Sequence, residues 1–292
     1  MKSALILLFV FFLLPDSMIA QLVTWRDIIE SDLPEPTARI HYGEDSLQFG
    51  DLWLPKNSEP HTTIILIHGG CWLSIYPGVE LMHLMANELR NHGFAVWNIE
   101  YRRIGHDGGG YPGTFLDVAK AADFLQTIAE EYGLNLNRVI SSGHSAGGHL
   151  ASWLSVRKNI PSNSVLYSPN PLHVHKVISL AGINDLERFG SYGSSSCGRD
   201  TIDNLVDKKN RGDSAFRDTS PIELLPFDLP FVEISAAFDA PVPPFFGYHF
   251  VDTVKKGGDE AILILQTEAG HFEMIAPWSK EWKEVLEVFL SF

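Results

Sequence analysis

Short apolar runs alternate with amphipathic segments along most of the chain. The run from Thr62 to Ile67 is continuous and rich in β-branched residues, which is typical of a strand buried on both faces of a parallel sheet. The segment from Thr114 to Tyr132 instead places its apolar residues on one stripe at helical spacing. This alternation predicts a mostly parallel sheet that helices cover on both faces.

The same pattern continues to the C-terminus. Alternation from Ser46 to Leu54 predicts an early edge strand or hairpin. Further strands are predicted at Phe94–Ile99, Arg138–Ser142, Val177–Leu180, Phe231–Ala236 and Ala261–Gln266. Further helices are predicted at Leu81–Arg90, Ala146–Leu154 and Pro277–Leu290, the last with Trp278, Trp282, Val285 and Phe289 on its inner stripe. One large α/β domain accounts for this order better than two small domains.

Two segments break the rhythm. Lys2 precedes an apolar run from Ala4 to Leu14, which predicts a secretory signal peptide over residues 1–20, with a retained N-terminal anchor as the alternative. The mature domain would then be residues 21–292, secreted or periplasmic, and no later segment is long and apolar enough to cross a membrane. The stretch from Ala181 to Pro230 is rich in Gly, Ser, Asp and Pro, so it fits a short lid over a site or a plain surface loop.

Charge and cysteine content bear on the possible partners of the protein and on the state of its thiols. The net charge of −14 gives an acidic surface that repels nucleic acid, so no nucleic-acid partner is expected. Cys71 and Cys197 could pair in an exported protein, but the sequence does not place them within bridging distance. From the sequence we therefore favour two free, partly buried thiols.

The segment Gly143-His144-Ser145-Ala146-Gly147 is the sharpest chemical signal in the chain. It follows a predicted strand and opens a predicted helix, which is the setting of a G-x-S-x-G nucleophile elbow. Glycines are needed on both sides because a Cβ there would clash with the neighbouring strand and helix. Ser145 is therefore the candidate nucleophile, and the amide of Ala146 can face an oxyanion at the start of the helix.

A second glycine-rich turn, His68-Gly69-Gly70-Cys71-Trp72, ends the first buried strand. A serine hydrolase needs at least two N–H donors that point at the developing oxyanion. The sequence predicts an oxyanion hole formed by Gly70 and Cys71 together with Ala146. The alternative is a simple turn at the end of a strand.

A serine nucleophile needs an imidazole base, and the base needs an acid that orients it. His271 lies in the loop after the last predicted strand, which is where the third member of a Ser–acid–His order belongs. Asp239 follows the preceding strand and is the candidate acid, with Asp185 as a rival one strand earlier. Such a triad requires no cofactor and no metal. His173 and His175 could chelate a metal, but no further ligand has suitable spacing beside them.

Taken together, these motifs resemble those of the α/β-hydrolase family, in the branch of bacterial carboxylesterases and kynurenine formamidases. The resemblance runs from about residue 45 to the C-terminus, and it is carried by the two glycine turns, by Tyr111–Val118, by Asp239 with Val242-Pro243, and by Gly270-His271. It implies an α/β-hydrolase fold and acyl hydrolysis, and the Ala181–Pro230 segment would be a short lid insertion in that fold. The sequence departs from the family at Cys71, where an aromatic residue or glycine is common, and at Ala236-Ala237-Phe238, where a glycine often precedes the acid.

Three functions are compatible with this reading. The first is hydrolysis of a carboxylic ester, on a small molecule or attached to a polysaccharide, through an acyl-enzyme. The second is an arylformamidase, which an exported location disfavours. The third is a non-catalytic binding module on the same fold, which the filled triad positions disfavour. Acyl and alcohol specificity and the oligomeric state are not encoded in any motif found.

Overall fold

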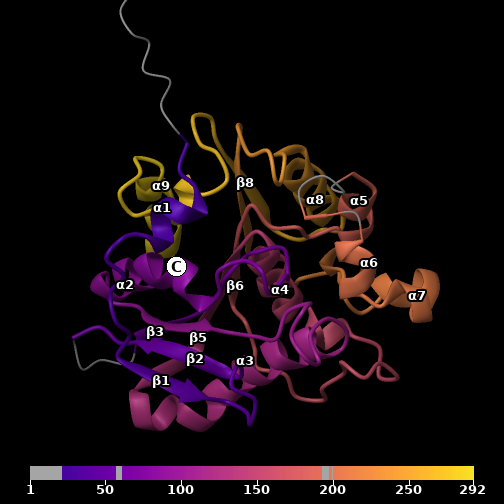
Figure 1. The fold of residues 1–292 in the computed structure, drawn as a ribbon, viewed down its shortest axis with the longest axis horizontal. Helices are drawn as coiled ribbons and strands as arrows, with labels where there is room; N and C mark the ends of the chain where they lie inside the picture. Colours follow the sequence, from indigo (N-terminus) through magenta and orange to yellow (C-terminus); the bar gives the residue numbers. More distant parts are fainter. Residues whose placement is uncertain (1–21, 57–60, 193–196, 199) are drawn as a thin grey trace, which may run out of the picture.

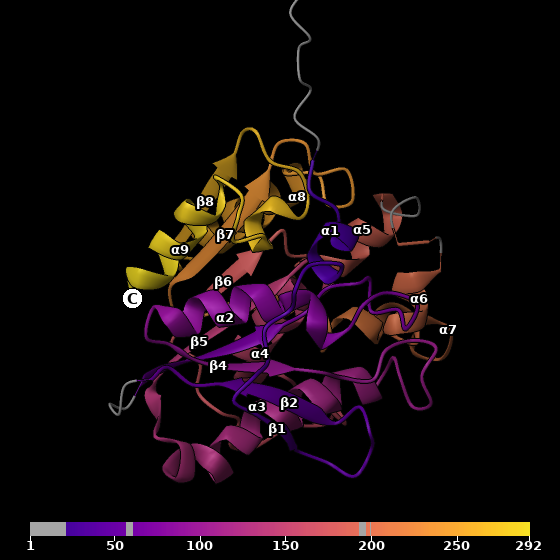
Figure 2. The same ribbon diagram turned by 60° about the vertical axis from the view of Figure 1, so that its left-hand side comes forward.

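The computed structural model describes residues 22–56, 61–192, 197–198 and 200–292. The predicted signal peptide, residues 1–20, lies outside the described residues. The fold is an eight-stranded sheet in the order β1-β2-β4-β3-β5-β6-β7-β8, with helices on both faces (Figures 1 and 2). The predicted mostly parallel α/β sheet is thereby confirmed.

The antiparallel part of the sheet lies at one edge. Strands β1 (Ala38–His41) and β2 (Phe49–Trp53) form a hairpin, and β2 pairs antiparallel with β4 (Ala95–Ile99). The predicted strand from Ser46 to Leu54 is shorter in the structure, and its partner β1 was not predicted. The β1 residues alternate between half-buried and exposed, as expected at an edge.

The parallel strands form the centre and the other edge of the sheet. They are β3 (His61–Ile67), β5 (Leu134–His144), β6 (Lys176–Leu180), β7 (Phe231–Ala236) and β8 (Ala261–Gln266). The strand β4 belongs to them as well, because it pairs parallel with β3. In β3, the four residues from Ile64 to Ile67 are fully buried, because helices cover both faces at this point. The carboxyl ends of these strands meet at one rim of the sheet, so loops that follow different strands come together there.

The helices α2 (His83–Asn91) and α9 (Trp282–Leu290) lie on one side of the sheet, and α3 (Gly113–Tyr132), α4 (Ala146–Ser155) and α8 (Phe245–Lys256) lie on the other (Figure 1). The predicted C-terminal helix begins later than expected. Trp278 therefore lies before the helix and is half exposed, not on its inner stripe. The inner stripe itself, Trp282, Val285 and Phe289, is buried as predicted.

The region between β6 and β7 consists of short helices. They are α5 (Leu186–Tyr192), α6 (Thr201–Leu205), α7 (Lys208–Arg211) and the 3-10 turns Gly212–Phe216 and Pro221–Leu224. A further short helix, α1 (Trp25–Ile29), lies near the start of the described chain and is closed by a capping box between Thr24 and Asp27. None of the helices in the described ranges is both long and apolar enough to span a membrane.

Candidate active site

Ser145 occupies a sharp turn between β5 and α4. Its φ and ψ are 57° and −119°, a conformation that costs a non-glycine residue about 1–3 kcal/mol. A Cβ on Gly143 would lie 2.3 Å from the carbonyl oxygen of Gly147, and a Cβ on Gly147 would lie 2.1 Å from that of Ile67. The turn can therefore form only with glycine on both sides. It places Ser145 at the carboxyl rim of the sheet, next to β6, where the Ser145 N–H donates a hydrogen bond to the Leu180 carbonyl.

His271 and Asp239 form a buried pair at the same rim. The Nδ1 of His271 lies 2.7 Å from Oδ2 of Asp239, and the other carboxylate oxygen of Asp239 accepts the Val242 N–H at 2.7 Å. The Asp239 side chain is fully buried and that of His271 nearly so. This bond leaves Nε2 of His271 as the nitrogen free to exchange a proton with a substrate or nucleophile.

His144 packs against His271. The Nε2–H of His144 donates to the backbone carbonyl of His271 at 2.8 Å, and the two ring centroids are 4.4 Å apart. Burial, together with the positive charge that His271 can carry, lowers the pKa of His144 well below its ordinary value. His144 is therefore neutral near pH 7 and fixes the backbone of the loop that carries His271.

The glycine-rich turn after β3 lies directly against Ser145. Gly70, Cys71 and Trp72 all have positive φ, at 97°, 52° and 55°. A Cβ on Gly69 would lie 2.8 Å from the backbone carbonyl oxygen of His144 and 3.1 Å from the Cβ of Ser145, so glycine permits this close approach. Among the residues that the structure describes, the N–H groups of Gly70, Cys71 and Ala146 have no acceptor.

A buried ionic cluster supports this turn from below. His68 bonds Glu100 at 2.9 Å and stacks on Tyr101, whose hydroxyl donates to the His68 carbonyl. Burial opposes the ionisation of Glu100, but the adjacent His68 and Arg103 outweigh it and lower its pKa to about 2. Arg103 in turn donates to the Tyr76 and Pro77 carbonyls, which ties the cluster to the wall of the neighbouring cavity.

Ser145 and His271 line one cavity of about 190 Å³. Within the described part of the chain, no hydrogen bond joins the Ser145 hydroxyl to His271; such contacts are often loose before substrate binds. None of the lining residues comes from the described part of 181–230; Trp25 of α1 closes one side instead. The full lining is Trp25, Gly70, Cys71, Tyr76, Pro77, Leu81, His144, Ser145, Pro241, His271 and Phe272.

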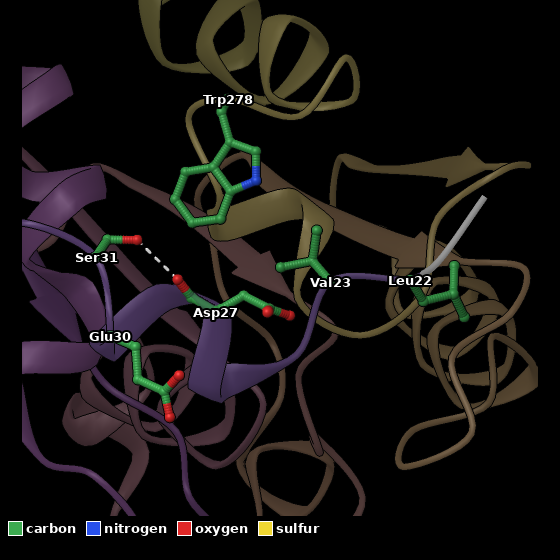
Figure 3. A pocket seen from close by; sticks show the side chains of 6 residues that line it. All are labelled: Leu22, Val23, Asp27, Glu30, Ser31 and Trp278. Carbon is green, nitrogen blue, oxygen red and sulfur yellow. Dashed lines mark hydrogen bonds between the residues drawn. The ribbon is translucent and has the colours of Figure 1, made fainter.

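A second hollow, of about 480 Å³, lies beside α1 (Figure 3). It is lined by Leu22, Val23, Asp27, Glu30, Ser31 and Trp278. Its one hydroxyl, on Ser31, donates to the Asp27 carbonyl, and no imidazole lies among these six residues. It therefore lacks the groups that activate a nucleophile.

The remaining sequence candidates lie elsewhere. Asp185, the rival acid, caps α5 at the Arg188 N–H and lies 3.5 Å from His249, not at His271. The rings of His173 and His175 contact each other, and the described residues contain no group of three or more metal-ligating side chains. Three further residues near the site were not predicted: His144, Trp25, and Glu273, which accepts the Gly270 N–H beside His271. Their roles depend on contacts between segments that are distant in the sequence.

The prediction of free thiols is wrong, because Cys71 and Cys197 form a disulfide with their Cα atoms 5.4 Å apart. The fold brings the turn after β3 to the segment between α5 and α6, although 126 positions separate the two cysteines. No local pattern in the sequence reports such a distance.

Comparison with known proteins identifies the class. Residues 51–248 match the BD-FAE family, so the chain belongs to this family of α/β-hydrolase esterases. Esterase LipC of Mycobacterium tuberculosis is 25% identical over 248 residues, which cover 81% of this chain and 57% of that protein. The probable isoprenylcysteine alpha-carbonyl methylesterase ICMEL1 of Arabidopsis thaliana is 25% identical over 252 residues, which cover 80% and 50%. This chain thus spans about half the length of these curated relatives.

Solved structures share the fold. Esterase B from Lactobacillus rhamnosis superimposes with a TM-score of 0.76 at 20% identity, over 91% of this chain and 90% of that one. A truncated carbohydrate esterase from gut microbiota gives a TM-score of 0.73 at 20% identity, over 89% and 96%. The predicted α/β-hydrolase fold is confirmed by this similarity.

Proposed function

We propose that this chain is a serine esterase that hydrolyses a carboxylic ester through an acyl-enzyme on Ser145. One observation carries the proposal: the strained Ser145 and His271 line a single cavity, and the buried Asp239 bonds His271 from behind. Gly70 and Cys71, whose N–H groups have no acceptor in the described part of the chain, line the same cavity. Membership of the BD-FAE family and the esterase names of the relatives support it.

In the proposed reaction, Ser145 Oγ attacks the acyl carbon while Nε2 of His271 takes its proton. Asp239 holds the Nδ1–H of His271 and stabilises the imidazolium that forms. The N–H groups of Gly70, Cys71 and Ala146 would bond the oxyanion of the tetrahedral intermediate. His271 then protonates the departing alcohol, and water deacylates Ser145 by the same route in reverse.

The proposed substrate is an ester on a small molecule or a polysaccharide. The solved relatives include a protein named as a carbohydrate esterase. Every relative named above is an esterase, so nothing favours the formamidase alternative. We also propose that the protein is exported, since a disulfide is typical of oxidising compartments.

The test compares p-nitrophenyl acetate hydrolysis by wild type, Ser145→Ala and Ser152→Ala. Ser152 is a matched control because it lies on α4 and its buried hydroxyl has no partner in the described part of the chain. We expect Ser145→Ala to lose activity by roughly 1,000-fold or more, while Ser152→Ala keeps it. A fluorophosphonate should label Ser145. Equal rates for wild type and Ser145→Ala, or labelling at another residue, would overturn the proposal.

A further inference from the structure

Cys71 takes part both in the cavity beside Ser145 and in a disulfide bond. It lines the cavity beside Ser145, and its sulfur is bonded to Cys197 on a distant segment. Its φ of 52° is in the left-handed region, which a non-glycine residue adopts only when its surroundings hold it there. A restraint on the Cys71 side chain is therefore also a restraint on the direction of its N–H.

The other contacts of the turn hold its neighbours and not Cys71 itself. The Gly70 carbonyl accepts the Leu73 N–H at 2.9 Å, and the Trp72 carbonyl accepts the Ile104 N–H at 2.8 Å. The Trp72 indole donates to Nδ1 of His149 on α4 at 3.2 Å. Within the described ranges, the disulfide is the only polar or covalent link from Cys71 to another segment.

Cys197 provides a firm anchor for this link. It is buried, with 6% of its surface exposed, and its carbonyl accepts the Thr201 hydroxyl at the start of α6. Two residues of α6, Ile202 and Leu205, belong to the hydrophobic core. A displacement of Cys71 would therefore strain a segment that the core holds in place.

We propose that the Cys71–Cys197 disulfide is a positioning element for the oxyanion, and that its reduction lowers kcat while the fold persists. The inference rests on the proposed esterase function. The Cys71 N–H would meet negative charge only after Ser145 has attacked. Loss of its fixed direction would therefore reduce stabilisation of the transition state more than binding of the substrate. The expected signature is a lower kcat at nearly constant KM.

The reduction itself is a two-electron exchange. A dithiol such as dithiothreitol supplies two electrons and two protons, so the S–S bond becomes two thiols and the reagent becomes a cyclic disulfide. Cys71 is half-buried and lines the cavity, so the reagent has a route to the bond. In a reducing environment, this protein would therefore lose esterase activity.

The experiment measures kcat and KM for p-nitrophenyl acetate on the full chain, before and after dithiothreitol, with titration of the two thiols released. Near-UV circular dichroism at the assay temperature reports whether the fold persists. We expect kcat to fall about tenfold, KM to change less than twofold, and oxidised glutathione to restore kcat; this is a fraction of the roughly 100–1,000-fold that loss of one oxyanion donor costs.

Two variants test whether the loss of kcat comes from opening the Cys71–Cys197 disulfide. Cys197→Ser leaves Cys71 in the turn and should resemble the reduced wild type, while the double variant Cys71→Ser/Cys197→Ser should be insensitive to dithiothreitol. Unchanged kcat in the fully reduced, folded chain would overturn the inference, as would a loss that follows the loss of near-UV signal. A wild type that neither hydrolyses esters nor reacts with a fluorophosphonate would instead refute the proposed function. If the variants fail to fold, reduction of the wild type still decides.

Discussion

Buried ionisable side chains behave differently on the two sides of this site. Glu100 stays charged because His68 and Arg103 lie beside it. Glu233, on β7, has no cation beside it among the residues described, and it accepts hydrogen bonds from the Gly182 N–H and the Asn184 side chain. Burial and, less strongly, the charge of Asp239 raise the pKa of Glu233 to about 8. Two glutamates of one protein are therefore expected in opposite protonation states at neutral pH.

This difference predicts how stability depends on pH. A carboxyl whose folded pKa is raised stabilises the fold fully below about pH 4.3, the usual pKa of an unfolded glutamate, and this contribution is lost as pH rises through about 8. Glu233→Gln keeps the volume but cannot ionise. A glutamine has one acceptor oxygen for the Gly182 and Asn184 donors, so the variant also loses some stability at every pH. Relative to wild type, its melting temperature should therefore rise by roughly 5 °C between pH 5 and pH 9. Scanning calorimetry of both proteins, with the exposed Glu223→Gln as control, tests this; parallel curves from pH 6 to 9 would contradict it.

At the scale of elements, the junction of β3, β5 and α4 has no spare volume. A Cβ on Gly147 would lie 2.1 Å and 2.6 Å from the carbonyl oxygens of Ile67 and His68. Those oxygens belong to the backbone of β3 and the glycine turn, so neither can move without disturbing the turn. Gly133, after α3, differs: it has a φ of 64°, but nothing lies within 4 Å of its Cβ position.

The two glycines separate steric overlap from backbone strain. Gly133→Ala should cost about 1 kcal/mol of unfolding free energy and keep full esterase activity, because only the left-handed conformation is penalised. Gly147→Ala should cost at least about 3 kcal/mol and lose most of the proposed esterase activity, because the backbone beside Ser145 must shift. Urea denaturation and p-nitrophenyl acetate assays measure both. A Gly147→Ala protein as stable as Gly133→Ala would show that the junction can relax.

The elements that the sequence predicts well are those with a strong local pattern. The apolar run of β3 and the long stripe of α3 match the structure within about one residue at each end. The strand β1 was missed because a run of four residues is too short to stand out, although it alternates, and α8 was not singled out. Ser145, His271 and Asp239 could be proposed as a triad because each follows a predicted strand. The structure bonds Asp239 to His271 and places Ser145 and His271 at one cavity. The disulfide and the role of Trp25 could not, since both depend on where distant segments meet.

At the scale of the whole molecule, the first described residues are part of the site. One oxygen of the Glu273 side chain accepts the Val23 N–H at 2.6 Å, and the other accepts the Gly270 N–H at 2.8 Å. Leu22 packs over Gly270, where an added Cβ would lie 3.0 Å from its Cδ1. Glu273 thus joins the first described residues to the residue before His271, and Trp25, two positions after Val23, reaches the cavity.

We therefore expect Glu273→Gln to affect both segments that the carboxylate joins, at Val23 and at Gly270. A glutamine has one acceptor oxygen, so one of the two buried N–H groups would face an NH₂ and lose its bond, at about 1–3 kcal/mol. The value of kcat/KM should fall roughly tenfold, and amide hydrogen exchange should accelerate across 22–29. Glu268→Gln is the matched control, because Glu268 is exposed on the same loop and pairs with Lys280 at the surface. Unchanged exchange across 22–29 in the Glu273 variant would show that packing of Leu22 and Ile28, without the carboxylate, holds this segment on the histidine loop.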